Sequence, residues 1–179
     1  MQGLLTHIQR ESWSLFFTGT YRTVAGKTER VRRAMQFQFL RRLSEFTGTK
    51  VGPQAGPASW ERLTWVLREE YGEATDRVHW HALIGGLRLG VTTPKTCMFM
   101  MGFWEGIGGG MARCRVYDAG QGAAEYIAKG LEGETGGANR YEVGKFGDET
   151  LMLIPSDSLL AKWKRNAAKN GGRHSAHVG

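Results

Sequence analysis

Two histidines separated by one residue are the first feature of this sequence that could perform chemistry. His79 and His81 lie in a segment, residues 77–84, that we predict to be a β-strand. Side chains at i and i+2 of a strand project from the same face, so both imidazoles can bind one ion. A third ligand could come from Glu69 or Glu70, of which alternation lets only one face the histidines. The alternative is that both imidazoles only hydrogen-bond or meet solvent on the sheet surface.

A tyrosine and a lysine one helical turn apart form a second candidate pair. Tyr126 and Lys129 occupy positions i and i+3 of a predicted amphipathic helix at 123–131, and therefore share one face of it. A phenol with an ordinary pKa of about 10 attacks poorly at neutral pH unless a cation lowers that pKa or the electrophile is strongly polarised. Lys129 and a bound metal could supply both effects, although such pairs also occur on ordinary surface helices.

These candidates need a rigid scaffold, which we expect from strands that alternate with helices. Apolar residues recur every three or four positions over 29–46 and predict an amphipathic helix, while Thr93 and Pro94 indicate the start of a helix that runs to about residue 104. Strands are predicted at 14–22, 60–71, 77–84 and 111–118, with a further edge strand at 140–146 and a terminal helix at 157–169. This order predicts an α+β fold in which helices cover one face of an antiparallel sheet.

The composition favours one intracellular domain with an anionic partner. The chain has 179 residues, 41% of them hydrophobic, which is enough for one core, and its net charge is +7. Cys97 and Cys114 lack the spacing of a zinc cluster, and the sequence contains neither a signal-peptide pattern nor an apolar run long enough to span a bilayer. We therefore expect a cytoplasmic protein with no membrane partner, with a domain at 1–150 and a basic tail at 151–179.

The order of these motifs resembles that of the HUH endonucleases, in particular the rolling-circle replication initiators, or Rep proteins. Residues 17–22 look like the first strand of the family, residues 79–81 like its His-hydrophobic-His metal motif, and residues 126–129 like its Tyr-x-x-Lys nucleophile helix. Glu70, nine residues before His79, matches the upstream acidic ligand of several viral members. The resemblance covers about residues 14–131.

The resemblance implies a ferredoxin-like or RNA-recognition-type fold and a DNA-nicking activity. His79, His81 and Glu70 would bind Mn²⁺ or Mg²⁺, and Tyr126 would attack a phosphate of single-stranded DNA at an origin or hairpin, assisted by Lys129. The products would be a 5′-phosphotyrosyl link and a free 3′-hydroxyl that can later be rejoined. Only one nucleophile is available near Tyr126, because the positions four residues before and after it are both glycine.

Basic and aromatic residues are candidates for contacts with the DNA. The backbone contacts would come from the basic tail and from Arg22, Arg30, Arg33 and Arg41, although arginines on a helix are by default a solvated face. A stacking surface could be formed by Trp60, Trp65 and Trp80, although tryptophans in strands usually belong to the core.

Two rival functions use overlapping features. A single-tyrosine transposase or mobilisation protein would use the same residues on a different DNA end. A non-catalytic module that binds single-stranded nucleic acid would need neither the histidine pair nor Tyr126. The sequence has no Gly-x-x-x-x-Gly-Lys phosphate loop, so strand separation would come from elsewhere, or this chain would be only the nuclease part of a longer protein. We expect a host helicase and a DNA polymerase as partners in copying plasmid or phage DNA.

Overall fold

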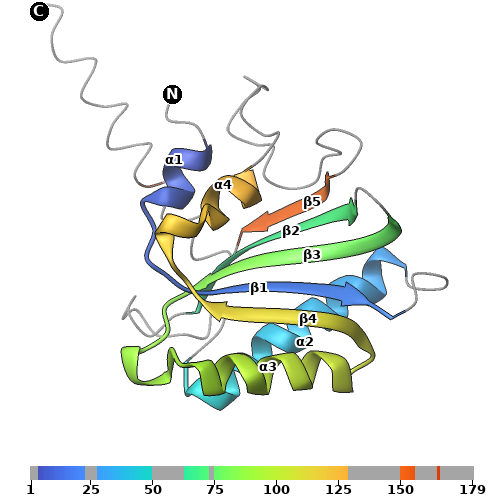
Figure 1. The fold of residues 1–179 in the computed structure, drawn as a ribbon, viewed down its shortest axis with the longest axis horizontal. Coiled ribbons are helices and arrows are strands. Elements are labelled where there is room, and N and C mark those ends of the chain that lie inside the picture. Colours follow the sequence, from blue (N-terminus) through green and yellow to red (C-terminus); the bar gives the residue numbers. More distant parts are fainter. Residues whose placement is uncertain are drawn as a thin grey trace, which may run out of the picture.

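One antiparallel sheet of five strands forms the centre of the molecule. The computed structural model describes residues 4–22, 28–49, 63–72, 75–128, 150–155 and 165. The strands are β1 (Trp13–Tyr21), β2 (Thr64–Gly72), β3 (Thr75–Gly85), β4 (Gly109–Val116) and β5 (Thr150–Pro155), and their order across the sheet is β4-β1-β3-β2-β5 (Figure 1). The helices are α1 (Leu4–Gln9), α2 (Glu29–Thr47), α3 (Pro94–Gly106) and α4 (Ala123–Ala128), with short 3₁₀ turns η2 (Leu89–Val91) and η3 (Ala119–Gln121).

The order of the elements along the chain defines the fold. From β1 to β4 the chain runs β1-α2-β2-β3-α3-β4, and these four strands lie in the order β4-β1-β3-β2 with every neighbouring pair antiparallel. This is the split β-α-β arrangement of ferredoxin-like folds. The predicted α+β, ferredoxin-like fold is therefore confirmed.

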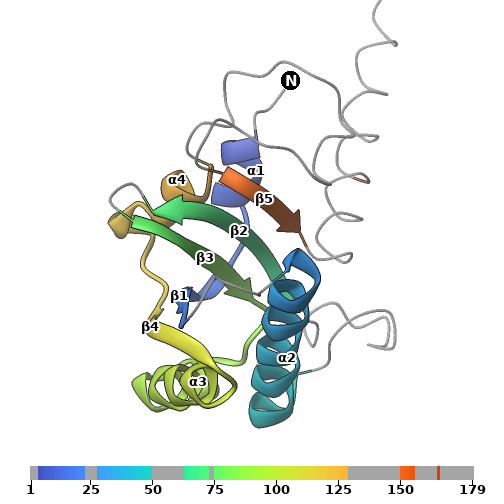
Figure 2. The same ribbon diagram turned by 90° about the vertical axis from the view of Figure 1, so that its right-hand side faces the viewer.

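Helices α2 and α3 cover one face of the sheet, and an aromatic core fills the space between them and the strands (Figure 2). Trp80 is fully buried there and Trp65 is 6% exposed, so both are core residues and not a stacking surface. Trp60 lies outside the described residues. Gly19 lies beneath these rings, where an added Cβ would come within 2.6 Å of Trp80 Nε1 and 3.0 Å of Trp104 Nε1. Only glycine fits at this point of β1 without displacing the two indoles.

The two short helices α1 and α4 lie together on the opposite side of the sheet (Figure 2). Ile127 and the alanines of α4 pack with Ile8 of α1 and with Val66 and Leu83 from the strands. The register of β1 shifts between Trp13 and Leu15, and Trp13 joins this second cluster. This packing places α4 above the central strands, on the face that the large helices leave uncovered.

Local signals explain where the two long helices begin and end. The Thr28 side chain accepts a hydrogen bond from the Val31 amide at the start of α2, and Gly48 ends that helix with φ of 67°, a conformation that favours glycine. The predicted cap at Thr93 is confirmed, because its side chain accepts from the Thr96 amide and Pro94 occupies the first turn of α3.

Two elements of the structure were not predicted from the sequence, and some predicted elements lie wholly or partly outside the described residues. Helix α1 and strand β5 were not predicted, and β5 pairs with β2 across the domain boundary expected at residue 150. The helix predicted at 123–131 is described as far as Ala128, the edge strand predicted at 140–146 lies outside the described residues, and of the terminal helix only Arg165 is described. None of the described helices is long and apolar enough to cross a membrane.

A buried carboxylate ties α2 to the sheet. Glu69 Oε1 accepts hydrogen bonds from the Tyr21 hydroxyl at 2.9 Å, from Arg32 Nε at 3.0 Å and from Gln36 Nε2 at 2.9 Å. Burial, followed by the charge of Glu69, raises the pKa of Tyr21 far above its ordinary value, so its phenol remains a donor. Glu69 is therefore a structural acid on the face covered by α2.

We predict that Glu69→Ala lowers the free energy of unfolding by about 3 kcal/mol, because it removes the buried carboxylate to which Tyr21, Gln36 and Arg32 all donate. Urea denaturation monitored by circular dichroism measures this. The control is Glu45→Ala, since Glu45 is exposed and forms exposed ion pairs with Arg41 and Arg42 of its own helix, so we expect a change below about 1 kcal/mol. Equal effects of the two substitutions would contradict a structural role for Glu69.

Candidate active site

The histidine pair lies on the sheet face that α4 partly covers. In the register of the sheet, His81 is flanked by Thr18 of β1 and Arg68 of β2, and His79 is flanked by Thr20 and Glu70. Residues paired across an antiparallel sheet point to the same face. Glu70, and not Glu69, therefore shares the face of the two histidines, which decides between the two acids that alternation left open.

The carboxylate of Glu70 is the point at which the site residues meet. Its Oε1 accepts a hydrogen bond from the Tyr126 hydroxyl at 2.5 Å and lies 3.1 Å from His81 Nε2, while its Oε2 lies 2.9 Å from Arg68 Nε. All three partners come from different elements, namely α4, β3 and β2 itself. Glu70 thus joins the strand pair to the helix above it.

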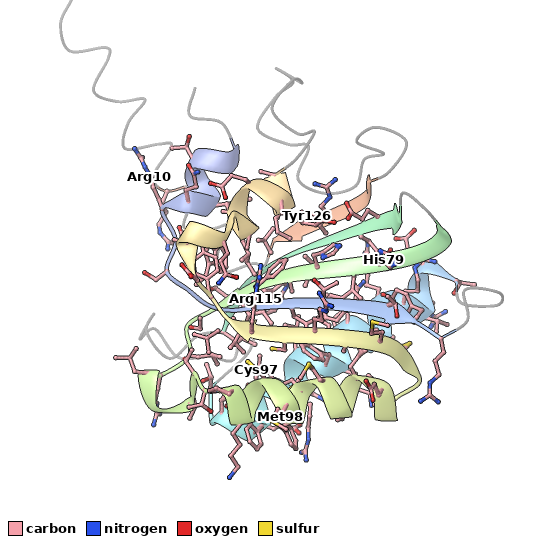
Figure 3. All side chains as sticks on the ribbon, viewed as in Figure 1. Arg10, His79, Cys97, Met98, Arg115 and Tyr126 are labelled. Atoms are coloured by element: carbon pink, nitrogen blue, oxygen red, sulfur yellow. The ribbon has the colours of Figure 1, made fainter. Side chains whose placement is uncertain are left out.

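Tyr126 combines a fixed hydroxyl with access to solvent. Besides its bond to Glu70, the hydroxyl lies 3.4 Å from His81 Nε2, and the two rings meet edge to face with centroids 4.7 Å apart. The residue is 40% exposed. Figure 3 shows Tyr126 on α4 on the side of the sheet opposite Met98 of α3, with His79 on β3. A substrate can therefore reach the phenol while the protein holds it.

Arg68 is a site residue that the sequence analysis missed. Its side chain is 2% exposed, and its NH1 group donates to the backbone carbonyl of Tyr126 at 2.9 Å and to that of Ile127 at 3.2 Å. Backbone carbonyls in the last turn of a helix carry a partial negative charge, so a buried cation stabilises them. Arg68 consequently fixes both Glu70 and the backbone of the residue that carries the phenol.

The surroundings of Glu70 keep it ionised. Burial by itself would raise the pKa of Glu70, but hydrogen bonds from His81 and Tyr126 and the charge of Arg68 outweigh burial and lower the pKa to about 2. The carboxylate is therefore charged at neutral pH and available as an acceptor or as a ligand.

The donor atoms of this site are compatible in part with a divalent metal. Ligands at about 2.1 Å from one ion, bound at adjacent positions, are about 3 Å apart, which is close to the 3.1 Å between His81 Nε2 and Glu70 Oε1. His79 lies opposite Glu70, which puts their Cβ atoms about 5 Å apart, so the backbone places it within reach of the same ion. Within the described part of the chain, no three His, Cys, Asp or Glu side chains are already close enough to hold an ion.

The other residues selected from the sequence lie elsewhere. Arg22 is exposed just after β1, and Arg30, Arg33 and Arg41 belong to α2, which covers the opposite face of the sheet from Tyr126. Lys129 lies outside the described residues. The structure therefore brings together His81, Glu70 and Tyr126, with His79 on the same face, and does not bring the arginines of α2 to them.

Comparisons with protein-family models, with curated proteins and with solved structures found no match to this chain. The geometry of the site itself must therefore carry any functional conclusion. That geometry joins a solvent-accessible phenol, an ionised carboxylate and an imidazole within hydrogen-bonding range of one another.

We predict that Arg68→Met releases α4 from the sheet. Loss of the two bonds to the helix carbonyls, each worth about 1.5 kcal/mol for a charged donor, reduces protection of the α4 amides from hydrogen exchange on the order of 100-fold. Native-state hydrogen exchange followed by mass spectrometry measures this. The amides of α3 serve as the internal control, and an equal loss of protection in α3 and α4 would show that Arg68 supports the whole fold and not the placement of α4.

Proposed function

We propose that this chain is a metal-dependent nuclease and strand transferase that nicks single-stranded DNA through Tyr126, as rolling-circle replication initiators do. One observation carries the proposal: the Tyr126 hydroxyl is bonded to Glu70 beside His81, on a face that solvent can reach. The motif order of the sequence, with the histidines before the tyrosine, supports the same assignment.

His79, His81 and Glu70 are the residues that would hold the ion. An Mn²⁺ or Mg²⁺ ion bound there would supply positive charge that polarises the scissile phosphate. Glu70 Oε2 is engaged by Arg68, so Oε1 is the oxygen that faces the imidazole and the phenol. Arg68 thereby orients the carboxylate for this role.

The reaction is a transesterification at phosphorus. The Tyr126 oxygen attacks, a bond forms between it and phosphorus, and the bond from phosphorus to the 3′ oxygen breaks. The products are a 5′-phosphotyrosyl link and a DNA strand that ends in a 3′-hydroxyl. Because the new ester conserves the free energy of the phosphodiester, a 3′-hydroxyl can reverse the step and join two strands without ATP.

Glu70 positions the phenol and does not deprotonate it in advance. A carboxyl with a pKa of about 2 is too weak a base to take the proton of a phenol whose ordinary pKa is about 10. The phenolic proton therefore passes to solvent as the bond to phosphorus forms, and the departing 3′ oxygen takes a proton from solvent. Lys129, one turn after Tyr126 in the sequence, is proposed to stabilise the charge on one of these oxygens.

The rival functions make different use of the same residues. A non-catalytic module that binds nucleic acid gives no reason for a phenol, a carboxylate and an imidazole to converge, so the site favours an enzyme. A single-tyrosine transposase or mobilisation protein would use this geometry unchanged, and only its DNA substrate would differ. A replication role brings with it an origin or hairpin as substrate, a host helicase and polymerase as partners, and a cytoplasmic location.

We predict that Thr18→Val lowers the affinity for Mn²⁺ about 10-fold, because the Thr18 hydroxyl lies 2.9 Å from His81 Nδ1 and holds the ring in the orientation that points Nε2 toward Glu70 Oε1. Isothermal titration calorimetry measures the affinity. Thr20→Val is the control, since Thr20 is on the same strand face but donates to the Met111 carbonyl. Equal affinities of the Thr18→Val and wild-type proteins would argue against His81 as a ligand.

We predict that Tyr126→Phe abolishes formation of the covalent protein–DNA adduct, with a loss on the order of 10³-fold or more, because only the attacking oxygen is removed. Labelled single-stranded DNA is incubated with the protein and Mn²⁺, and the adduct is resolved by denaturing electrophoresis. Tyr117→Phe is the control, since Tyr117 packs beside the α4 cluster but is not bonded to Glu70. Wild-type adduct formation by the Tyr126→Phe protein would exclude Tyr126 as the nucleophile.

A further inference from the structure

We propose that the DNA strand beside the cleaved phosphate is held by the β4 surface, which we define as Arg113 and Arg115 of β4 with Phe16 of β1. This inference rests on the proposed function, because it assigns a location to the substrate of that reaction. It also differs from the expectation that the arginines of α2 hold the DNA backbone.

The register of the sheet places the β4 surface next to the catalytic face. Arg113 lies opposite Thr18, and Thr18 lies opposite His81, so Arg113 and His81 point to the same side with one strand between them. Neighbouring strands are about 4.8 Å apart, which puts the backbones of Arg113 and His81 about 10 Å apart. Phe16 is paired in the same way with Arg115 on one side and Leu83 on the other.

The chemistry of this surface matches a single strand of DNA. Arg113 and Arg115 are exposed, lie two residues apart on one face, and form no ion pair with any described side chain. None of the described side chains of β1, β3 and β4 is acidic. The Cα atoms of the two arginines are about 7 Å apart, so their like charges repel each other, and successive phosphates of an extended strand would relieve that repulsion.

Phe16 adds a platform for a base. The Arg115 guanidinium carbon lies 5.0 Å from the centre of the Phe16 ring, and the ring is half-buried and nearly parallel to the His81 imidazole, at 10° between the planes. Single-strand binding surfaces combine cations that contact the backbone with aromatic rings on which bases stack. Figure 3 shows Arg115 on β4 on the same side of the sheet as Tyr126 and His79.

The arginines of α2 are a weaker candidate for this role. Arg33 pairs with Glu29, and Arg41 and Arg42 pair with Glu45, so acids of the same helix neutralise them. Arg32 is engaged by Glu69 within the fold. All four lie on the helix that covers the other face of the sheet.

Two charge-matched double variants test the proposal, both made in the Tyr126→Phe protein so that binding is measured without reaction. Fluorescence anisotropy follows a fluorescein-labelled single-stranded DNA of about 20 nucleotides, in Mn²⁺, over a series of salt concentrations. Arg113→Ala with Arg115→Ala is expected to weaken binding about 10-fold and to reduce the dependence of log affinity on log salt by about 1.4, which is 0.7 for each lost phosphate contact. Arg30→Ala with Arg41→Ala, which removes the same formal charge, is expected to change affinity less than about twofold.

A third variant separates stacking from charge. Phe16→Leu is expected to weaken binding about fivefold or more and to leave the salt dependence unchanged, because it removes a ring and no charge. Thermal unfolding by circular dichroism confirms that each variant is folded. Equal losses for the two arginine pairs, or a larger loss for the α2 pair, would overturn the proposal.

DNA binding by the β4 variants and adduct formation by the wild-type protein test the binding surface and the nicking activity separately. A wild-type protein that forms the covalent adduct, combined with β4 variants that bind DNA normally, would refute the β4 surface alone. A wild-type protein that binds through β4 but forms no adduct would refute the nicking activity and leave the binding surface standing.

Discussion

A buried carboxylate remains ionised only where cations and donors surround it, and the site of this protein is organised around that requirement at Glu70. Arg68, His81 and Tyr126 meet the requirement from β2, β3 and α4. Because Arg68 also holds the last carbonyls of α4, the charge balance of the strand pair and the position of the helix depend on each other. The short helix owes its placement to this contact as well as to the packing of Ile127.

Much of the fold and part of the site follow from local patterns. The period of two on β3 put His79 and His81 on one face. The helical period predicted α2 and the helix of Tyr126, and the cap at Thr93 with Pro94 predicted α3. Alternation alone could not choose between Glu69 and Glu70, because the choice depends on which face of β2 the helices cover. Arg68 could not be identified, since nothing in its neighbourhood indicates that a strand arginine will meet the carbonyls of a helix 58 residues later.

The position of the proposed DNA-binding surface could not be predicted from charge alone. Net charge and the arginines at 30–42 indicated a polyanionic partner, yet composition does not say which side of a sheet a helix will cover. The alternation of Met111, Arg113 and Arg115 with Ala112 and Cys114 did contain usable information, because it predicts that both arginines share the outer face of a strand. That pattern gains meaning only when the strand is placed beside β1 and the histidine face.

Glu69 and Glu70 are adjacent and point to opposite faces of the sheet, so the register of β2 is constrained. Glu69 serves the helix-covered side and Glu70 the reactive side, so a one-residue shift of the strand would exchange their surroundings and bring each carboxylate to partners arranged for the other. An insertion or a deletion within this strand would therefore disturb both sides of the sheet at once. Insertions and deletions in this part of the protein are therefore expected outside β2. Recombination between related genes would preserve the site only where it keeps the register of β2 against β3.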